Sequence, residues 1–338
     1  MRECLKLIAL LILLPIGLVA GEHDARIRAV LDHHILPGFQ HLSEEAEDLS
    51  NSAAQCSTDK EGVKAAYHDA FDAWIQVSHL RFGPSETGDR AFALAYWPDS
   101  KGFTPKTLTS LLNSADPIVQ DPEAFSTLSI AGRGFYALEF LLYDERLSML
   151  GDPAYRCALI AAIAGDIDAN VAAIRNDWET GYAASLSQPG GDSPYRSEAE
   201  AAQELFKALL TGLEFTAETR LGRPLGTFDR PRPRRAEVWR SERSLSHVRL
   251  SLASLRDLAA LLAEGYPSTA ETLDRAFAKA IDRADTLDDP IFAGVVDPKG
   301  RIKVEALQQQ VNNIRALAES DLGPRLGVAA GFNSLDGD

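Results

Sequence analysis

The segment Gly134–Tyr143, with the sequence GFYALEFLLY, carries a single charged side chain, that of Glu139. A helix that is apolar on every side is normally buried on every side, and a glutamate is rarely buried unless a partner offsets its charge. Tyr136, Glu139 and Tyr143 are spaced i, i+3 and i+7, so they share one face of this helix. The chain therefore has to surround the segment and supply a partner for Glu139, either in a structural ion pair or in a functional site.

Apolar residues recur with a helical period along most of the chain, and no run of alternating, β-branched residues indicates a strand. Pro37 predicts a kink in the first helix. Besides Gly134–Tyr143 and a short helix at 104–112, we expect main helices at residues 27–49, 59–80, 154–184, 197–220, 244–263, 268–287 and 304–322. The pattern predicts an all-α protein of two four-helix-bundle-like domains that pack together with a cleft between them.

The most linker-like passage is SQPGGDSP, at residues 187–194. Its Pro, Gly and Ser content predicts a domain boundary there. We therefore place an N-terminal bundle at residues 21–186 and a C-terminal bundle at residues 195–338. Such a division agrees with the length of the chain, which exceeds what one hydrophobic core usually organises.

The first twenty residues predict a secretory signal peptide, because Arg2 and Lys6 flank the start of an apolar run from Leu7 to Val19. This run is short for a membrane span, and no other segment approaches ~20 consecutive apolar residues. We expect a soluble exported protein in the periplasm or outer cell envelope, with no transmembrane span once the signal peptide is cleaved. An uncleaved N-terminal anchor is the alternative.

The charge balance is strongly acidic, with a formal net charge of −15. Removal of residues 1–20 takes away Arg2, Lys6 and Glu3, which gives −15 − 2 + 1 = −16. Such a charge argues against nucleic acid and anionic membrane surfaces as partners. A local basic stretch nevertheless remains at Arg230 to Arg243.

Two cysteines, Cys56 and Cys157, remain after export, because Cys4 lies within the signal peptide. An even number of cysteines in an oxidising compartment favours a disulfide over a free thiol nucleophile. We therefore predict a Cys56–Cys157 bond.

Several catalytic signatures are absent from the sequence: HExxH, the P-loop, GxGxxG, GxSxG and paired ExxH motifs. A hydrolase with one of these patterns has no support. Three histidines of the first expected helix, His33, His34 and His41, are interpreted as surface or interface residues, because His34 and His41 are two helical turns apart, too far to share a metal.

The chain resembles the imelysin family, which is classed with M75 peptidases and includes periplasmic iron-uptake proteins. The family motif GxHxxE stands here as Gly134 to Glu139, GFYALE. Three further segments are similar to the family: WIQVSHLRFGP (74–84), YWPDSKG (96–102) and VWRSERSLSHVRLSL (238–252). The resemblance implies two four-helix bundles with the motif near their junction.

The motif histidine is replaced by Tyr136 in this chain. The resemblance implies a His/Glu pair for metal binding or proton transfer, and only Glu139 carries over. A neutral phenol is a poor metal ligand because its ordinary pKa is ~10. Fe(III) does accept carboxylate and phenolate oxygens, so Glu139 is a candidate ligand for iron or for a divalent metal.

Arg243 is the expected partner of Glu139, because a guanidinium binds a carboxylate through two hydrogen bonds. With this pair, we predict a ligand-binding site whose members are Tyr136, Glu139, His79, Arg81, Trp97, Arg240, Arg243 and His247.

Three functions follow from these residues and from the resemblance. The first is an exported, non-catalytic protein that binds a small ligand or metal in iron acquisition, with periplasmic or outer-membrane uptake proteins as partners. The second is a metallopeptidase of the M75 type. The third is a partner-binding module in which the Glu–Arg contact is purely structural.

Overall fold

The computed structural model describes residues 17–328, so most of the predicted signal peptide lies outside the described residues. Within this range the chain is all-helical, and its single β-type pairing is an isolated bridge between Thr227 and Arg230. The predicted all-α class is confirmed. The longer helices are α1 (Gly17–Val30), α2 (Leu36–Ala53), α3 (Lys60–Val77), α5 (Phe103–Ser114), α7 (Gly134–Tyr143), α8 (Pro153–Asp177), α10 (Glu198–Glu214), α12 (Ser244–Leu262), α13 (Pro267–Asp285) and α14 (Pro298–Leu317).

Polar residues at the helix starts explain where several of these helices begin. Asp59, Asp152 and Asp297 each accept hydrogen bonds from backbone N–H groups in the first turn of α3, α8 and α14. Ser197 does the same at the start of α10. These caps satisfy donors that have no partner within the helix.

The expected kink at Pro37 takes the form of a π-helical turn, Leu31–Ile35, that joins α1 to α2. Proline has no N–H to donate to the preceding turn, so the local hydrogen-bond pattern has to change there. A second π-helical turn, Phe215–Leu221, prolongs α10 and leads into the short helix α11 (Gly222–Leu225).

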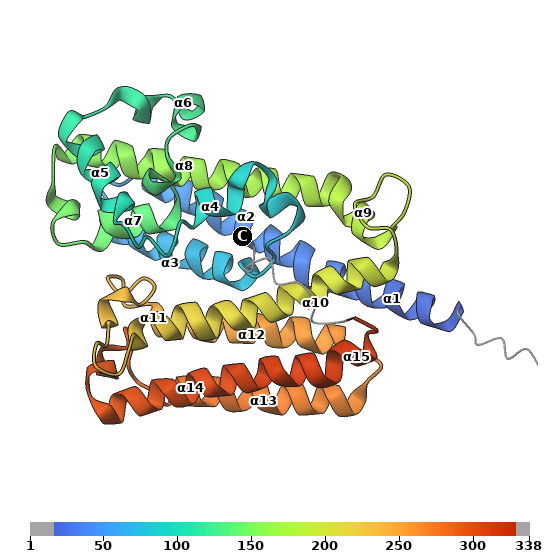
Figure 1. Cartoon of the computed structure of the whole chain (residues 1–338). Coiled ribbons are helices and arrows are strands. Elements are labelled where there is room, and N and C mark those ends of the chain that lie inside the picture. The colour runs from blue at the N-terminus through green and yellow to red at the C-terminus, as the bar shows by residue number, and fades with distance from the viewer. Residues whose placement is uncertain (1–16, 329–338) are drawn as a thin grey trace, which may run out of the picture.

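The helices lie in two layers (Figure 1), one formed around α2, α3, α7 and α8 and the other by α10, α12, α13 and α14. Contacts between α3 and α12, and between α1 and both α10 and α12, hold the layers together. The buried apolar residues form one continuous cluster from Ile27 to Val328. The division into two domains at residues 187–194 therefore stays a prediction.

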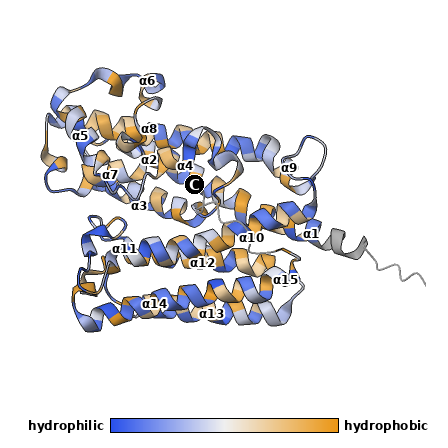
Figure 2. Cartoon of the chain, viewed as in Figure 1, coloured by the Kyte–Doolittle hydropathy of each residue, from blue (hydrophilic) through white to orange (hydrophobic). Residues whose placement is uncertain are grey.

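Hydropathy follows this packing. Figure 2 shows mainly hydrophobic residues on α7 and many hydrophilic ones on α13 and α14. One described helix, Pro153–Ser187, is long and apolar enough to cross a membrane by length and composition alone. Its residues Ile163, Ile167 and Val171 are fully buried, and the helix packs against α2. These contacts are those of a core helix.

The predicted disulfide is present and joins Cys56, just after α2, to Cys157 in α8. It links two helices that also pack along their length.

Gly134 sets the position of α7. Its φ of +75° lies in the left-handed region, and a Cβ built on it would lie 2.3 Å from the carbonyl oxygens of both Ala93 and Leu94. Residues 93 and 94 end the short helix α4 (Arg90–Leu94). Glycine is therefore required at the first position of the GFYALE motif, because α7 starts against a neighbouring backbone.

We predict that Gly134→Ala lowers the free energy of unfolding by about 2–5 kcal/mol, from the left-handed backbone and the overlap together. Gly88→Ala is the matched control, since Gly88 has a φ of +61° and nothing within 4 Å of an added Cβ. The control should lose only about 1–2 kcal/mol. Urea denaturation measures both, and equal losses would show that the overlap does not matter.

Candidate functional site

A cavity of about 420 Å³ opens between the C-terminal end of α3, the loop that carries Trp97, and the adjoining face of α10. Its apolar wall is largely aromatic and is formed by Trp74, Phe82, Phe92, Trp97 and Phe215. Its polar lining consists of Ser78, His79, Arg81, Glu86, Tyr136, Glu204, Lys207, Thr211, Arg220 and Glu237. Ligand sites combine such an apolar wall with a few polar groups, so we call this cavity the aromatic pocket.

The floor of the aromatic pocket is a buried hydrogen-bonded cluster around Glu237, which is 1% exposed. The Tyr136 hydroxyl donates to Glu237 Oε1 at 2.5 Å, and Arg220 Nε donates to Oε2 at 2.8 Å. His247 Nδ1 lies 3.3 Å from the same Oε2. One carboxylate thus accepts hydrogen bonds from a phenol and a guanidinium and contacts an imidazole.

These contacts decide the protonation of the floor. Burial raises the pKa of Glu237, but Arg220, His247 and the Tyr136 hydroxyl outweigh it and hold the pKa at about 2. Burial, together with the Glu237 charge, moves the pKa of Tyr136 well above its ordinary value. Glu237 is therefore a carboxylate at neutral pH, and Tyr136 is a neutral phenol that donates a hydrogen bond.

Every acidic group that lines the pocket is paired with a basic one. Besides Arg220 and Glu237 on the floor, Arg81 Nε lies 2.5 Å from Glu86 Oε1, and Lys207 Nζ lies 3.7 Å from Glu204 Oε1. The charges of these pairs cancel. The pocket therefore presents aromatic surface without a net charge.

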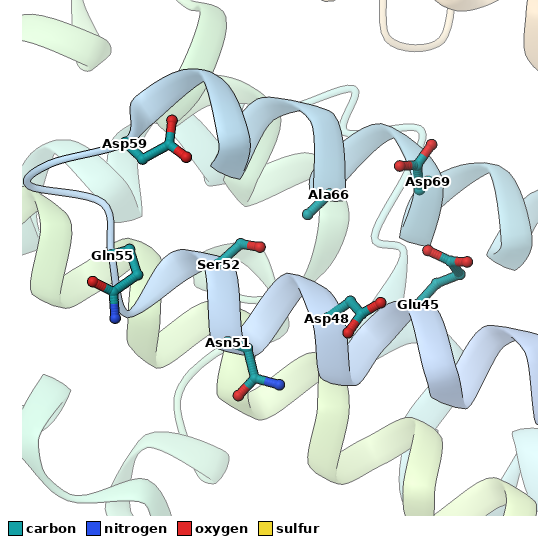
Figure 3. A pocket seen from close by; sticks show the side chains of 8 residues that line it. All are labelled: Glu45, Asp48, Asn51, Ser52, Gln55, Asp59, Ala66 and Asp69. Carbon is teal, nitrogen blue, oxygen red and sulfur yellow. The ribbon is translucent and has the colours of Figure 1, made fainter.

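A second hollow, of about 400 Å³, is acidic and has no aromatic lining. Figure 3 shows Glu45 and Asp48 on α2 on one side of this groove, with Asp59 at the start of α3 and Asp69 on α3 on the other side. The Asp59 carboxylate already caps α3. The aromatic pocket, with its buried ionised floor, is therefore the stronger candidate site.

Glu139 lies behind the floor and is 2% exposed. Its Oε1 accepts hydrogen bonds from the backbone N–H of Arg240 at 3.0 Å, the backbone N–H of Ser241 at 3.2 Å and the Ser241 hydroxyl at 3.3 Å. The Arg240 side chain pairs with Asp144 at the end of α7, at 2.9 Å. The segment after Glu237 is thus fixed to α7 at two points.

The expected Glu139–Arg243 pair is wrong, because Arg243 pairs with Asp72 on α3. Val238 and Glu242 both have positive φ values, which turn the intervening backbone N–H groups toward α7. Backbone donors therefore replace the expected guanidinium at Glu139.

Similarity to known proteins agrees with this architecture. The family model described as imelysin, peptidase M75, matches residues 35–318. The chain belongs to the imelysin family. Iron-regulated protein A of Synechococcus elongatus is 23% identical over 324 residues, which cover 88% of this chain and 85% of that protein.

Two solved structures share the fold. An imelysin-like protein from Psychrobacter arcticum superposes with a TM-score of 0.77 at 19% identity, covering 93% of this chain and 98% of that one. A putative iron-regulated protein A precursor from Parabacteroides distasonis gives a TM-score of 0.72 at 13% identity, covering 88% and 95%.

The imelysin motif therefore reaches the aromatic pocket through Tyr136. Of the predicted site residues, His79, Arg81, Trp97 and Tyr136 line this pocket. The other four, Glu139, Arg240, Arg243 and His247, do not line it, although His247 contacts the floor residue Glu237. Whether any of the eight binds a ligand stays a prediction.

Sequence reasoning missed Glu237 and Arg220. Arg220 had a detectable signal, because it follows Leu213 and Ala217 at the i+7 and i+3 positions of one apolar helix face. Glu237 had no such signal. It directly precedes the family-like segment 238–252 and lies in a loop, where no helical periodicity predicts which residues are buried.

His34 is a half-buried interface residue that lies in the π-helical turn and faces the pocket residue His79. Their Nε2 atoms are 2.9 Å apart. Burial lowers the pKa of His34 to about 4 and that of His79 well below its ordinary value, with the neighbouring His34 and Arg220 adding to the effect on His79. Both imidazoles are therefore neutral at pH 7.

The metal that the resemblance implied does not fit these residues as they are arranged. Among residues 17–328, no group of three or more His, Cys, Asp or Glu side chains is placed to hold a metal ion. Glu237 is held by Arg220 and Tyr136, and Glu139 Oε1 by the Arg240–Ser241 backbone. The assignment of Glu139 as a metal ligand stays a prediction without support from this geometry.

Glu139 should make stability depend on pH. Burial raises its pKa from 4.5 to about 7, against the charge of Arg240 and the hydrogen bonds of Ser241 and Arg240. The folded state then binds a proton that the unfolded chain releases, so this stabilisation is complete below pH 4.5 and is lost as the pH rises through about 7. Relative to Glu139→Gln, the wild type should lose up to about 3 kcal/mol across that window.

Urea denaturation at several pH values measures this difference. Glu271→Gln is the control, because Glu271 is an exposed partner of Arg275. A wild-type-minus-Glu139→Gln difference that stays flat with pH would contradict the prediction.

The two kinds of ion pair in the pocket should differ in their contribution to stability. Glu237→Gln leaves the Arg220 guanidinium, which is 3% exposed, without its counter-charge and should cost about 3–5 kcal/mol. Glu86→Gln breaks the exposed pair with Arg81 and should cost at most about 1 kcal/mol. Equal losses in urea denaturation would show that Glu237 is not the anchor of the floor.

Proposed function

We propose that this protein is an exported, non-catalytic ligand-binding member of the imelysin family that works in iron acquisition. Relatives with the name iron-regulated protein A support the link to iron, and one of them is described as a precursor. The Cys56–Cys157 disulfide supports export to an oxidising compartment.

The hydrogen bond from Tyr136 to Glu237 is the observation that carries this proposal. Tyr136, a neutral hydrogen-bond donor, stands at the motif position of the family. Its hydrogen bond helps to keep Glu237 ionised, with a pKa of about 2. A carboxylate of such low basicity is a weak general base, since efficient bases have a pKa near the working pH. The floor is therefore suited to recognition rather than to catalysis.

The walls indicate the kind of ligand. Paired charges leave little attraction for a bare ion, whereas Trp97 and Phe215 offer aromatic surface at the pocket. The hydroxyl of Thr211 and the neutral imidazole of His79 provide hydrogen-bonding groups. We infer a small, flat organic ligand that is carried free or as an iron complex.

A second candidate is a partner-binding module. It is favoured by the contacts of Glu139, whose hydrogen bonds attach residues 240–241 to α7 in a way that needs no ligand. The metallopeptidase alternative requires a metal-held water, and the arrangement of the described residues favours no site for one.

Calorimetric titration and intrinsic fluorescence test the proposal, with 2,2′-bipyridine, its ferrous complex, haemin and ferric citrate as probes. We expect saturable binding of at least one aromatic probe, weakened about tenfold or more by Trp97→Ala, which removes a wall of the pocket. Trp239→Ala is the control, since Trp239 lies outside the pocket and packs beside Arg240.

Two results would contradict the proposal. Absence of saturable binding by every probe, together with a stability change in Glu139→Gln, would favour the partner-binding module. Peptide hydrolysis that disappears with a chelator and in Glu139→Ala would establish the peptidase instead.

A further inference from the structure

Three large apolar side chains protrude at one end of the molecule. Phe228 is 75% exposed, and Val296 and Ile302 are each 63% exposed. Phe228 lies in the loop after α11, Val296 in the short turn Ala293–Val296 before α14, and Ile302 in the first turns of α14. These segments lie at the same end in Figure 1. The short helical turns Ala293–Val296 and Pro233–Arg235 contact each other there. We call residues 226–235 and 293–303 the basic tip.

Phe228 is held outward by a braced turn. The backbone N–H of Arg230 donates to the Thr227 carbonyl at 3.1 Å, which closes a tight turn with Phe228 inside it. Arg301 Nη1 donates to the carbonyls of Leu225 at 2.7 Å and Thr227 at 3.3 Å. The hydrogen bonds of Arg301 and Arg230 therefore fix the turn in which the Phe228 ring is exposed.

The same surface is rich in positive charge. Four exposed arginines follow the turn, and two exposed lysines flank Ile302 on α14: Arg230, Arg232, Arg234, Arg235, Lys299 and Lys303. None of these six forms an ion pair within 4.0 Å in the part of the chain that the structure describes. Lys299, Ile302 and Lys303 are spaced i, i+3 and i+4, so they share one face of the helix.

Acidic groups do little to neutralise this surface. The basic tip holds two acidic residues, Asp229 and Asp297, against seven basic ones. The Asp297 carboxylate caps α14 by accepting hydrogen bonds from the backbone N–H groups of Lys299 and Gly300. The basic tip is thus a local positive region on a chain whose net charge is −15.

We propose that the basic tip docks the protein on an anionic membrane surface. Basic residues attract acidic headgroups, and apolar side chains beside them enter the boundary between headgroups and acyl chains. The negative charge of the rest of the protein weakens this attraction little, because fields are screened within ~8–10 Å at physiological ionic strength. The local positive charge of the basic tip therefore determines its attraction to a membrane. The net charge of the chain, by contrast, predicted that anionic membranes are not partners.

A lipid surface fits the basic tip better than an acidic protein does. Phe228 lies in one segment and Val296 and Ile302 in another, and exposed basic residues follow or flank them in the sequence. A rigid partner would need a matching recess for each of them, whereas lipids adapt to separate protrusions. This docking is independent of the ligand proposed for the aromatic pocket.

Co-sedimentation with vesicles tests the proposal on the full-length protein as the cell processes it. Vesicles contain phosphatidylglycerol mixed with phosphatidylcholine, or phosphatidylcholine alone. We expect binding to the anionic vesicles that decreases with salt and is weakened about tenfold or more by Phe228→Ser and by Arg230→Glu/Arg234→Glu. Met149→Ser is the matched control, because Met149 is also 75% exposed but lies outside the basic tip.

All variants share one N-terminus, so differences between them report on the basic tip, and circular dichroism confirms that each variant is folded. Equal binding of the wild type and Phe228→Ser, or equal binding to both vesicle types, would overturn the proposal. Retention on immobilised polyglutamate that the arginine variant loses, without any vesicle binding, would also overturn it and would identify a docking surface for an acidic protein.

Discussion

The ion pair between Arg220 and Glu237 is the interaction on which the site depends. Both groups are almost fully buried, and burial of either one alone would be strongly unfavourable. Glu237 also receives the Tyr136 hydroxyl from α7 and contacts His247 on α12. One carboxylate therefore joins both helical layers and the π-helical end of α10, and it forms the floor of the aromatic pocket.

The two buried glutamates show how surroundings decide the state of a carboxyl group. Glu237 has a guanidinium as its direct partner, so its pKa is held at about 2. Glu139 has backbone and hydroxyl donors, and the nearest Arg240 nitrogen is 3.9 Å from its Oε2, so burial prevails and its pKa rises to about 7. One group serves as a permanent negative charge, whereas the other holds a loop in place and titrates near neutrality.

Two of the four π-helical turns in residues 17–328 lie at the aromatic pocket, whereas Trp178–Tyr182 and Ala318–Leu322 do not line it. The π-helical turn Leu31–Ile35 contains His34, which meets His79 at the pocket, and the turn Phe215–Leu221 carries both Phe215 and Arg220. A widened turn redirects the side chains that follow it, and such turns occur often at functional sites. Tyr136, which stands where the family resemblance implies a histidine, acts in the same region as a hydrogen-bond donor to Glu237.

The sequence by itself determined the helices, their approximate ends and the burial of α7, because helical periodicity and capping residues are local properties. It also identified the cysteine pair and, through the GFYALE motif, the helix that supplies Tyr136. Only the tertiary structure decided which group meets each carboxylate. Arg243 pairs with Asp72 rather than Glu139, and Glu237 reaches Tyr136 from 101 positions away, because backbone turns with positive φ at Val238 and Glu242 set the course of that loop. Such turns depend on contacts distant in sequence, which periodicity does not record.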